Sequence, residues 1–136
     1  MITGVVNADL EATIPLVVRG TNAKRKRDSA QPQERREERQ IYAVIDTGFT
    51  GYLTLPSALV THFDLEWLSL EHALLGAGSI HSFDVYRAIV IWDGESREVE
   101  VNLTETGPLI GMSMLFSQAM RIEVVIGGLV RIARLE

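Results

Sequence analysis

The 136-residue sequence contains no cysteine, which excludes disulfide bonds, thiolate catalysis and zinc sites built on thiolates. It has no run of about 18 apolar residues, so a membrane-spanning helix is excluded and no membrane partner is expected. The start of the chain lacks the basic and then apolar layout of a secretory signal. We therefore expect a cytoplasmic protein.

Motifs for metal, cofactor and serine chemistry are also missing. His62, His72 and His81 are ten and nine residues apart, whereas two zinc ligands on one helix lie a single turn apart. No serine lies in the Gly-x-Ser-x-Gly pattern of a nucleophile elbow. Gly76 and Gly78 lack the third glycine of a dinucleotide-binding loop. The sequence thus predicts no metal and no cofactor.

Charge is distributed unevenly along the chain. The net charge is −5, but residues 21–40 carry seven basic and four acidic residues, so the remainder carries six basic and 14 acidic residues, a net −8. An acidic body argues against a nucleic-acid partner, because phosphate binding needs a contiguous positive face. Residues 21–40 have almost nothing to bury, which predicts a charged flexible loop. A basic address or nucleic-acid contact at Lys24–Arg27 is the less favoured alternative.

Three turn signals separate stretches that read as strands. The expected strand pairs are 2–6 and 10–19 around Asn7-Ala8-Asp9, 83–92 and 95–104 around Asp93-Gly94, and 121–126 and 129–135 around Gly127-Gly128. Asp-Gly and Gly-Gly favour tight hairpins because both central positions can adopt positive φ. The chain is therefore expected to contain several β-hairpins.

Alternation of apolar and polar residues predicts which strand side chains are buried. The residues expected to face inward are Val99, Val101, Leu103, Ile122, Val124 and Ile126. Residues 41–45 are apolar throughout, which predicts a strand covered on both faces. Short helices are expected only at 56–63, near Pro56, and at 113–119. Many short strands with little helix indicate one all-β domain over residues 1–136, a small barrel or sandwich.

The most informative motif is Asp46-Thr47-Gly48, which directly follows the apolar run 41–45. Taken alone, this tripeptide is best explained as a turn at the end of a strand, since aspartate caps turns and glycine bends the chain. An acid delivered by a buried strand is also a candidate for acid–base catalysis. The surrounding segments decide between the two interpretations.

Three further segments accompany the motif. A glycine-rich stretch, Leu75–Ile80, follows it, and Leu109–Leu115 combines two apolar residues, a glycine and a candidate helix. Apolar strands at 122–126 and 130–135 then end the chain. In this order, over about residues 10–135, the segments resemble the retropepsin-like aspartic proteases, both the retroviral enzymes and the small stand-alone ones of prokaryotes. The resemblance implies a closed β-barrel of the acid protease fold, a single lobe with one or two short helices.

The resemblance implies that Asp46 is the catalytic carboxylate, that the Thr47 hydroxyl hydrogen-bonds across a dimer, and that Gly48 lets the substrate backbone approach. Aspartic proteolysis uses two carboxylates that share one proton: the ionised one takes a proton from water and the protonated one donates to the peptide carbonyl. Because the chain has a single Asp-Thr-Gly, the second carboxylate must come from an identical chain across a two-fold axis. The expected function is a homodimeric aspartic endopeptidase acting on peptide or protein substrates.

Other residues receive supporting roles from the resemblance. The residues implied to form the tip of a flap over the substrate are Gly76, Ala77 and Gly78. Ile110 and Gly111 are implied to pack behind the catalytic loop. Retroviral members often carry an acid shortly after Asp-Thr-Gly and an arginine after the late glycine, where this chain has Thr50 and Met112. Since both partners of that pair are absent together, a different local packing is expected.

Two other interpretations remain open. The fold can persist as a catalytically silent peptide-binding or dimerisation module. Alternatively, Asp46 is only a turn residue in a monomeric β-barrel that binds a ligand. Cleavage by the wild type and by an Asp46→Asn variant, together with the number of chains per particle, distinguishes the three.

Overall fold

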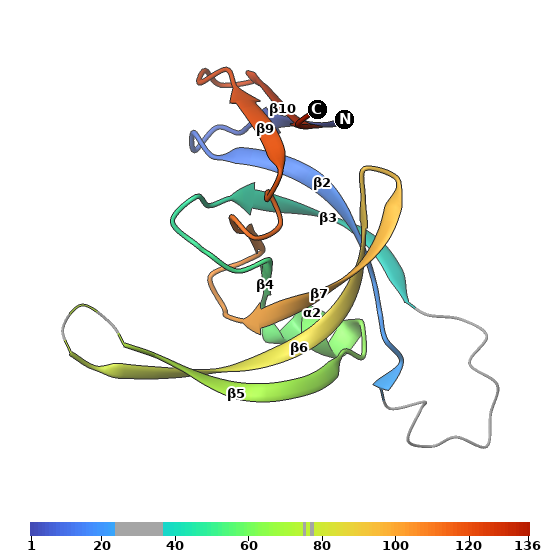
Figure 1. The fold of residues 1–136 in the computed structure, drawn as a ribbon, viewed down its shortest axis with the longest axis vertical. Helices are drawn as coiled ribbons and strands as arrows, with labels where there is room; N and C mark the ends of the chain where they lie inside the picture. The colour runs from blue at the N-terminus through green and yellow to red at the C-terminus, as the bar shows by residue number, and fades with distance from the viewer. Residues whose placement is uncertain (24–36, 75, 77) are drawn as a thin grey trace.

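The computed structural model describes residues 1–23, 37–74, 76 and 78–136. Strands account for more than half of these residues, so the prediction of an all-β chain is confirmed. The strands are β1 (Ile2–Val6), β2 (Ala12–Arg19), β3 (Glu38–Ile45), β4 (Leu53–Leu55), β5 (Glu66–Leu74), β6 (Ile80–Trp92), β7 (Glu95–Leu103), β8 (Leu109–Ile110), β9 (Gln118–Ile122) and β10 (Leu129–Arg134), and helix α2 is Ser57–His62 (Figure 1).

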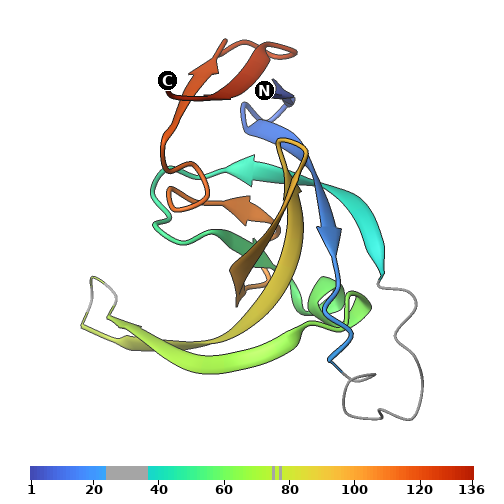
Figure 2. The ribbon, with the colours of Figure 1, turned by 45° about the vertical axis from the view of Figure 1, so that its right-hand side comes forward.

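The strands form one sheet in the order β5-β6-β7-β4-β8-β3-β2-β1-β10-β9. An additional pairing between β6 and β2 brings the sheet back onto itself, so that the strands from β6 round to β2 form a ring. Figures 1 and 2 show this curled sheet, with β9 and β10 at one end and the β5–β6 hairpin projecting from the body at the other. The hydrophobic core is built from buried residues of the ring strands, of helix α2, and of β1 and β10 beside the ring.

Two of the three predicted turns follow from local chemistry. Asp93 and Gly94 have φ of 50° and 81°, the positive values that a tight Asp-Gly hairpin turn needs. In the β1–β2 turn, the backbone N–H groups of Asp9 and Glu11 donate to Asn7 Oδ1 at 3.0 and 2.9 Å. The side chain of Asn7 therefore replaces backbone partners in the turn, as asparagine commonly does. Both hairpin predictions are confirmed.

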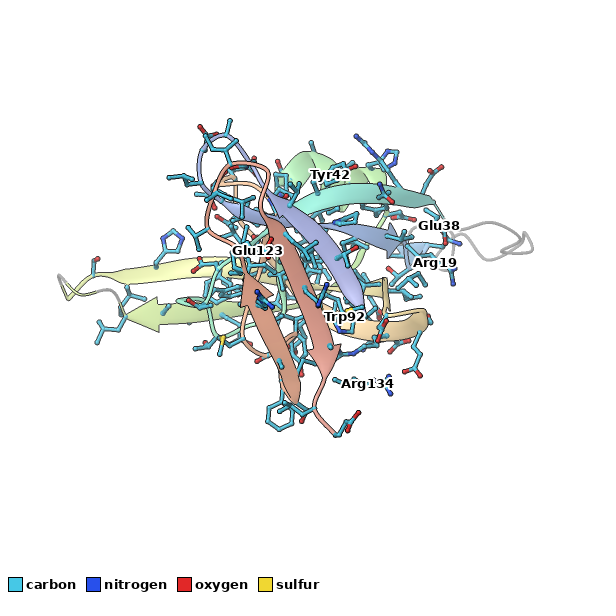
Figure 3. The ribbon with its side chains drawn as sticks, turned by 90° about the horizontal axis from the view of Figure 1, so that it is seen from above. Arg19, Glu38, Tyr42, Trp92, Glu123 and Arg134 are labelled. Carbon is cyan, nitrogen blue, oxygen red and sulfur yellow. The ribbon has the colours of Figure 1, made fainter. Side chains whose placement is uncertain are left out.

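The core matches the predicted alternation in β7. Val99 and Val101 are 4% and 0% exposed, and Leu103 packs against the core from its edge. Helix α2 confirms the helix predicted over 56–63, and Phe63 directly after it is fully buried. The prediction that residues 41–45 are covered on both faces is wrong, because Tyr42 is 65% exposed on the outside of β3 (Figure 3). Only one face of this strand packs on the ring interior.

The strand predicted over 121–126 lies earlier in the chain than expected. β9 is Gln118–Ile122, and its pairing with β10 ends at the Ile122–Val130 pair. The chain then leaves the sheet, so Val124 and Ile126, predicted to face inward, are 71% and 68% exposed. Backbone hydrogen bonds between β1 and the two glycines hold this wide turn: Gly127 N–H donates to the Val6 carbonyl, and Val6 N–H donates to the Gly128 carbonyl.

The helix predicted over 113–119 is also wrong. Residues 112–117 form consecutive turns, and Gln118 already belongs to β9. Ser117 has φ of 65°, which is outside the right-handed helical region and ends any helical run there. The apolar spacing of this segment also suits a series of turns that buries Met114 and Leu115 in the core, so the spacing alone did not distinguish turns from a helix.

The predicted flexible loop over 21–40 is wrong at both ends. At its start, Thr21, Asn22 and Ala23 are buried, and the Ala23 N–H donates to the Asp64 carbonyl at 3.1 Å. Glu38–Gln40 belong to β3 and pair with Val17–Arg19 of β2, an arrangement that the Arg19–Glu38 ion pair at 2.7 Å reinforces (Figure 3). Residues 24–36, including the basic run, lie outside the described residues. In the described part of the chain, none of the helices has the length and apolar character needed to cross a bilayer.

Candidate active site

Asp46 is the first residue after β3, and its backbone is anchored by the neighbouring strand. Its N–H donates to the Ile110 carbonyl at 2.9 Å, continuing the parallel β3–β8 ladder by one bond. Ile110 is fully buried, so this bond fixes the Asp46 backbone to the core. The Asp46 side chain itself is only partly buried, at the point where the strand emerges from the ring.

The Asp46-Thr47-Gly48 sequence forms a turn that holds one carboxylate oxygen. Gly48 N–H donates to Asp46 Oδ1 at 2.9 Å, and Phe49 N–H donates to the Asp46 carbonyl at 3.1 Å. Within the described residues, the carboxylate accepts no other hydrogen bond, so its second oxygen remains available to water or to a ligand. The Thr47 side chain and Gly48 are exposed beside it.

The segment after β8 packs directly against the loop that carries Asp46, as the resemblance implied for Ile110 and Gly111. Gly111 N–H donates to the Tyr52 carbonyl at 3.0 Å. A Cβ atom on Gly111 would lie 2.3 Å from the Gly51 carbonyl oxygen and 2.7 Å from the Phe49 carbonyl oxygen. Only glycine permits this approach, because real Cβ atoms do not come so close to backbone oxygens.

The place of the missing arginine–acid pair is taken by hydrogen bonds. Met112 N–H donates to the Phe49 carbonyl at 2.8 Å, and Ser113 N–H donates to the Gly51 carbonyl at 3.1 Å. The Ser113 hydroxyl also donates to the Thr50 carbonyl. These hydrogen bonds between neutral groups join the loop that carries Asp46 to the segment that follows β8.

Sequence reasoning did not single out Phe49 and Gly51. A Cβ atom on Gly51 would lie 2.5 Å from the Phe49 ring, and one on Gly111 would lie 2.6 Å from it. The ring therefore lies against both glycines. The available signal was the second glycine three residues after Gly48, which a simple strand-end turn does not require.

The residues predicted to form the tip of a flap lie at the end of a long hairpin. β5 and β6 pair from Glu66–Arg87 out to Leu74–Ile80, and the hairpin projects from the body (Figures 1 and 2). Gly76 and Gly78 lie in its tip, Gly78 with φ of 79°, and Ala77 lies outside the described residues. Leu74 and Ile80, which flank the tip, are 75% and 71% exposed. The hairpin thus ends in exposed apolar side chains and glycines.

A cleft of about 260 Å³ lies between the Asp46 loop and this hairpin. Its lining residues are Phe49, Thr50 and Gly51 from the loop, Glu71 and His72 from β5, Phe83 and Val85 from β6, and Glu100 and Asn102 from β7. His72 Nδ1 lies 2.7 Å from the Ser82 hydroxyl, and Ser69 donates to Glu71 at 2.9 Å. The cleft combines apolar walls with the carboxylates of Glu71 and Glu100.

Metal chemistry finds no support in the described part of the chain, where no three His, Asp or Glu side chains gather in a way that could hold an ion. Comparison with known proteins adds no identification: no protein-family model, no curated protein and no solved structure matches the chain. The functional argument therefore depends on the Asp46 turn, its support from β8 and the cleft under the hairpin.

Proposed function

We propose that the chain is one half of a homodimeric, retropepsin-like aspartic endopeptidase, in which the ring of strands acts as a single barrel-like lobe. The observation that carries the proposal is the Asp46 turn: a partly buried carboxylate held by the Gly48 N–H and anchored to the core through Ile110. The residues that follow the turn, Phe49–Gly51, line a cleft together with the β5–β6 hairpin and β7. A turn with no catalytic role does not require the backing by Gly111 or the neighbouring cleft.

The chemistry requires a second Asp46 from a partner chain. Two carboxylates brought together across a two-fold axis cannot both ionise easily, so they hold one proton between them. The ionised carboxylate takes a proton from a water molecule as that water attacks the peptide carbonyl carbon. The protonated carboxylate donates to the carbonyl oxygen, giving a tetrahedral gem-diol intermediate. The carboxyl group that took the proton from water then donates it to the amide nitrogen, the other carboxylate takes back a hydroxyl proton, and the C–N bond breaks to release an amine and a carboxylic acid. No covalent enzyme intermediate forms, and no cofactor takes part.

The neighbouring groups have roles that fit this scheme. The exposed Thr47 hydroxyl, which makes no hydrogen bond within the described residues, is available to the partner chain. An extended peptide would bind in the cleft between the Asp46 loop and the β5–β6 hairpin, with alternate side chains entering pockets. Leu74 and Ile80 at the hairpin end would cover the peptide and exclude water.

Replacing the acid tests the proposal. Asp46→Asn keeps an oxygen that can accept the Gly48 N–H, so the turn should persist while the proton-sharing pair is lost. We expect the variant to remain a dimer and to lose cleavage by about a hundredfold or more. The assay uses extended peptides with apolar and basic side chains, because Phe49 and Phe83 line the cleft together with Glu71 and Glu100.

Asp9→Asn is the matched control, since Asp9 lies in the β1–β2 turn and its side chain accepts no hydrogen bond within the described residues. It should cleave at the wild-type rate. Equal cleavage by wild type and Asp46→Asn would reject the protease. A wild-type dimer that cleaves nothing would favour the silent peptide-binding module, and one chain per particle in solution scattering would favour the monomeric ligand binder.

A further inference from the structure

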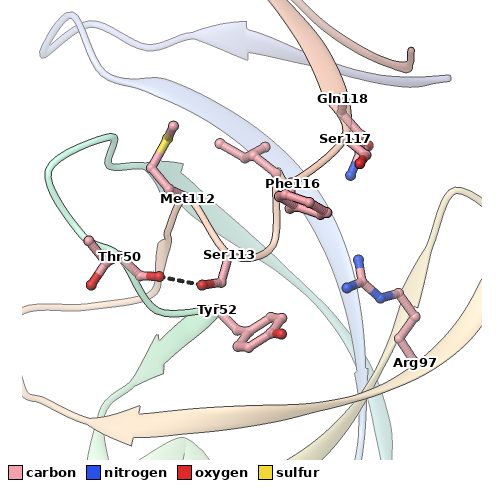
Figure 4. A pocket seen from close by; sticks show the side chains of 9 residues that line it. Thr50, Tyr52, Arg97, Met112, Ser113, Phe116, Ser117 and Gln118 are labelled. Atoms are coloured by element: carbon pink, nitrogen blue, oxygen red, sulfur yellow. Dashed lines mark hydrogen bonds between the residues drawn. The ribbon is translucent and has the colours of Figure 1, made fainter. Parts of the chain in front are cut away.

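A second and larger cleft, of about 680 Å³, lies on another side of the Asp46 loop. Its walls come from Thr50 and Tyr52 of that loop, from Arg97 of β7 and from most of the segment 112–118 (Figure 4). Thr50 is the lining residue that it shares with the cleft under the hairpin. Its volume is in the range of small-molecule binding sites, about 300–1,000 Å³. We call it the Arg97 cleft.

The side chain of Arg97 points inward, which is unusual for a charged residue. Along β7, Val99 and Val101 point into the core, and strand alternation places Arg97 on the same inward face. The side chain is partly buried, and Figure 4 shows it reaching into the cleft. An apolar residue is expected at such a position, because an inward-facing charge loses hydration.

Arg97 has no counter-ion in the part of the chain that the structure describes. Within the described residues, its guanidinium contacts the Met114 sulfur at 3.9 Å and forms no ion pair. The nearest acid along the same face of β7, Glu95, is bound to Arg134 at 2.8 Å instead. Buried or partly buried charges are normally paired, so the unpaired guanidinium indicates that an anion binds in the cleft.

Three hydroxyl groups complete the set of unused donors. Thr50, Tyr52 and Ser117 line the cleft, and their side-chain hydroxyls make no hydrogen bond within the described residues. Gln118, by contrast, is fully engaged: its amide oxygen accepts from Trp92 at 3.1 Å and its amide nitrogen donates to the Met114 carbonyl at 3.1 Å. The free donors are therefore one cation and three neutral hydroxyls.

We propose that the Arg97 cleft binds a carboxylate attached to an apolar group. One guanidinium matches a single negative charge and can bind a carboxylate with two parallel hydrogen bonds, whereas a phosphate dianion would bring more charge than one arginine neutralises. Met112, Leu115 and Phe116 provide an apolar wall for the rest of the ligand. The carboxylate is that of a free apolar acid or of a peptide C terminus.

The binding experiment uses the full-length Asp46→Asn protein, so that proteolysis cannot interfere and the two proposals can fail separately. Hydrocinnamate, its neutral amide and inorganic phosphate are titrated by calorimetry and by amide NMR shifts. We expect hydrocinnamate to bind about tenfold or more tightly than the amide, with shifts at Arg97, Tyr52 and Ser117. Equal binding of acid and amide, tighter binding of phosphate, or shifts elsewhere would overturn the proposal.

Arg97→Gln should weaken hydrocinnamate binding by about tenfold or more. Arg131→Gln is the matched control, because Arg131 is exposed on β10 and forms no ion pair within the described residues. Equal losses in both variants would contradict a specific site. If Arg97→Gln does not fold, the comparison of acid and amide on an intact Arg97 remains decisive.

Peptides ending in phenylalanine, with a free or an amidated C terminus, distinguish the two carboxylate sources. If the peptide with a free C terminus binds more tightly than hydrocinnamate and the amidated peptide does not bind, the cleft is assigned to a peptide C terminus. Hydrocinnamate binding as tightly as the free peptide, or more tightly, assigns it to a free apolar acid.

Discussion

The geometry of Asp46 and Gly48 suits both a strand-end turn and the catalytic position that we propose. The Gly48 N–H bound to Asp46 Oδ1 is the capping hydrogen bond expected of a strand-end turn. The same bond orients a carboxylate and leaves its other oxygen open, which is what acid–base catalysis needs. The sequence could therefore identify the turn from three residues, but it could not show what lies behind it.

Gly111 is the residue whose substitution should most disturb the site. In Gly111→Ala, the new Cβ would meet backbone oxygens at 2.3 and 2.7 Å, so the Asp46 loop must shift. We expect a loss of about 1–3 kcal/mol in the free energy of unfolding, measured by urea denaturation. Gly76→Ala, where the new Cβ has no neighbour within 4 Å, is the control and should change stability by less than about 0.5 kcal/mol. Equal stability of Gly111→Ala and wild type would show that the Asp46 loop can accommodate a Cβ atom at position 111 without a loss of stability.

At the scale of elements, the shortest strands organise the site. β8 has two residues and β4 has three, yet β8 joins β3 in parallel and β4 in antiparallel pairing. This places residues 109–113 beside residues 44–54 although more than 50 residues separate them in the chain. Neither strand is long enough to show a period of two, so local pattern could not predict their pairing.

Helix α2 begins with help from a distant loop. Its N-cap residue, Pro56, offers no side-chain cap, and Glu105 instead accepts a hydrogen bond from the Ser57 N–H at 2.9 Å. That backbone hydrogen bond, with the Ser57 side chain as a second cause, lowers the pKa of Glu105 below 4.5. A helix N-terminus favours such a negative charge.

Glu105 should therefore make stability depend on pH. Because its pKa is lower in the folded than in the unfolded chain, its contribution is present above the unfolded value and is lost as the pH falls through the folded one. We expect Glu105→Gln to melt slightly below wild type at neutral pH, with the gap closing as the pH falls through the lowered pKa of Glu105 in the folded chain. Glu98→Gln, at an exposed β7 position without an ion pair in the described residues, should show no such gap. A constant gap for Glu105→Gln would contradict the capping role.

At the scale of the whole molecule, the proposal depends on two chains meeting at Asp46. The sequence contains no cysteine, so a single introduced cysteine reports one contact without interference. We expect Asp46→Cys to form a disulfide-linked dimer on mild oxidation, because a disulfide requires Cα atoms within about 7 Å of each other. The covalent dimer is measured by non-reducing gel electrophoresis.

Asp9→Cys is the control for that measurement, since Asp9 is exposed in the β1–β2 turn. It should stay monomeric on the same gel. A dimer in solution whose Asp46→Cys variant does not cross-link faster than Asp9→Cys would mean that the paired chains do not share their carboxylates.

The sequence by itself determined the all-β class, the hairpins at Asn7 and Asp93, helix α2 and the position of the Asp46 turn. These features depend on residues that are close in the chain, where turn chemistry and alternation act directly. The packing of Ile110 and Gly111 against the Asp46 loop depends instead on the hydrogen bonds of β8, which join segments far apart in the chain.

Only the tertiary structure decided the exposure of Val124 and Ile126, the ring closed by β6 and β2, and the unpaired Arg97 that faces inward. Each depends on contacts between segments far apart in the chain. Whether an apolar side chain is covered, or a charge is paired, is settled by which distant segment arrives beside it, and periodicity along one strand carries no information about that partner.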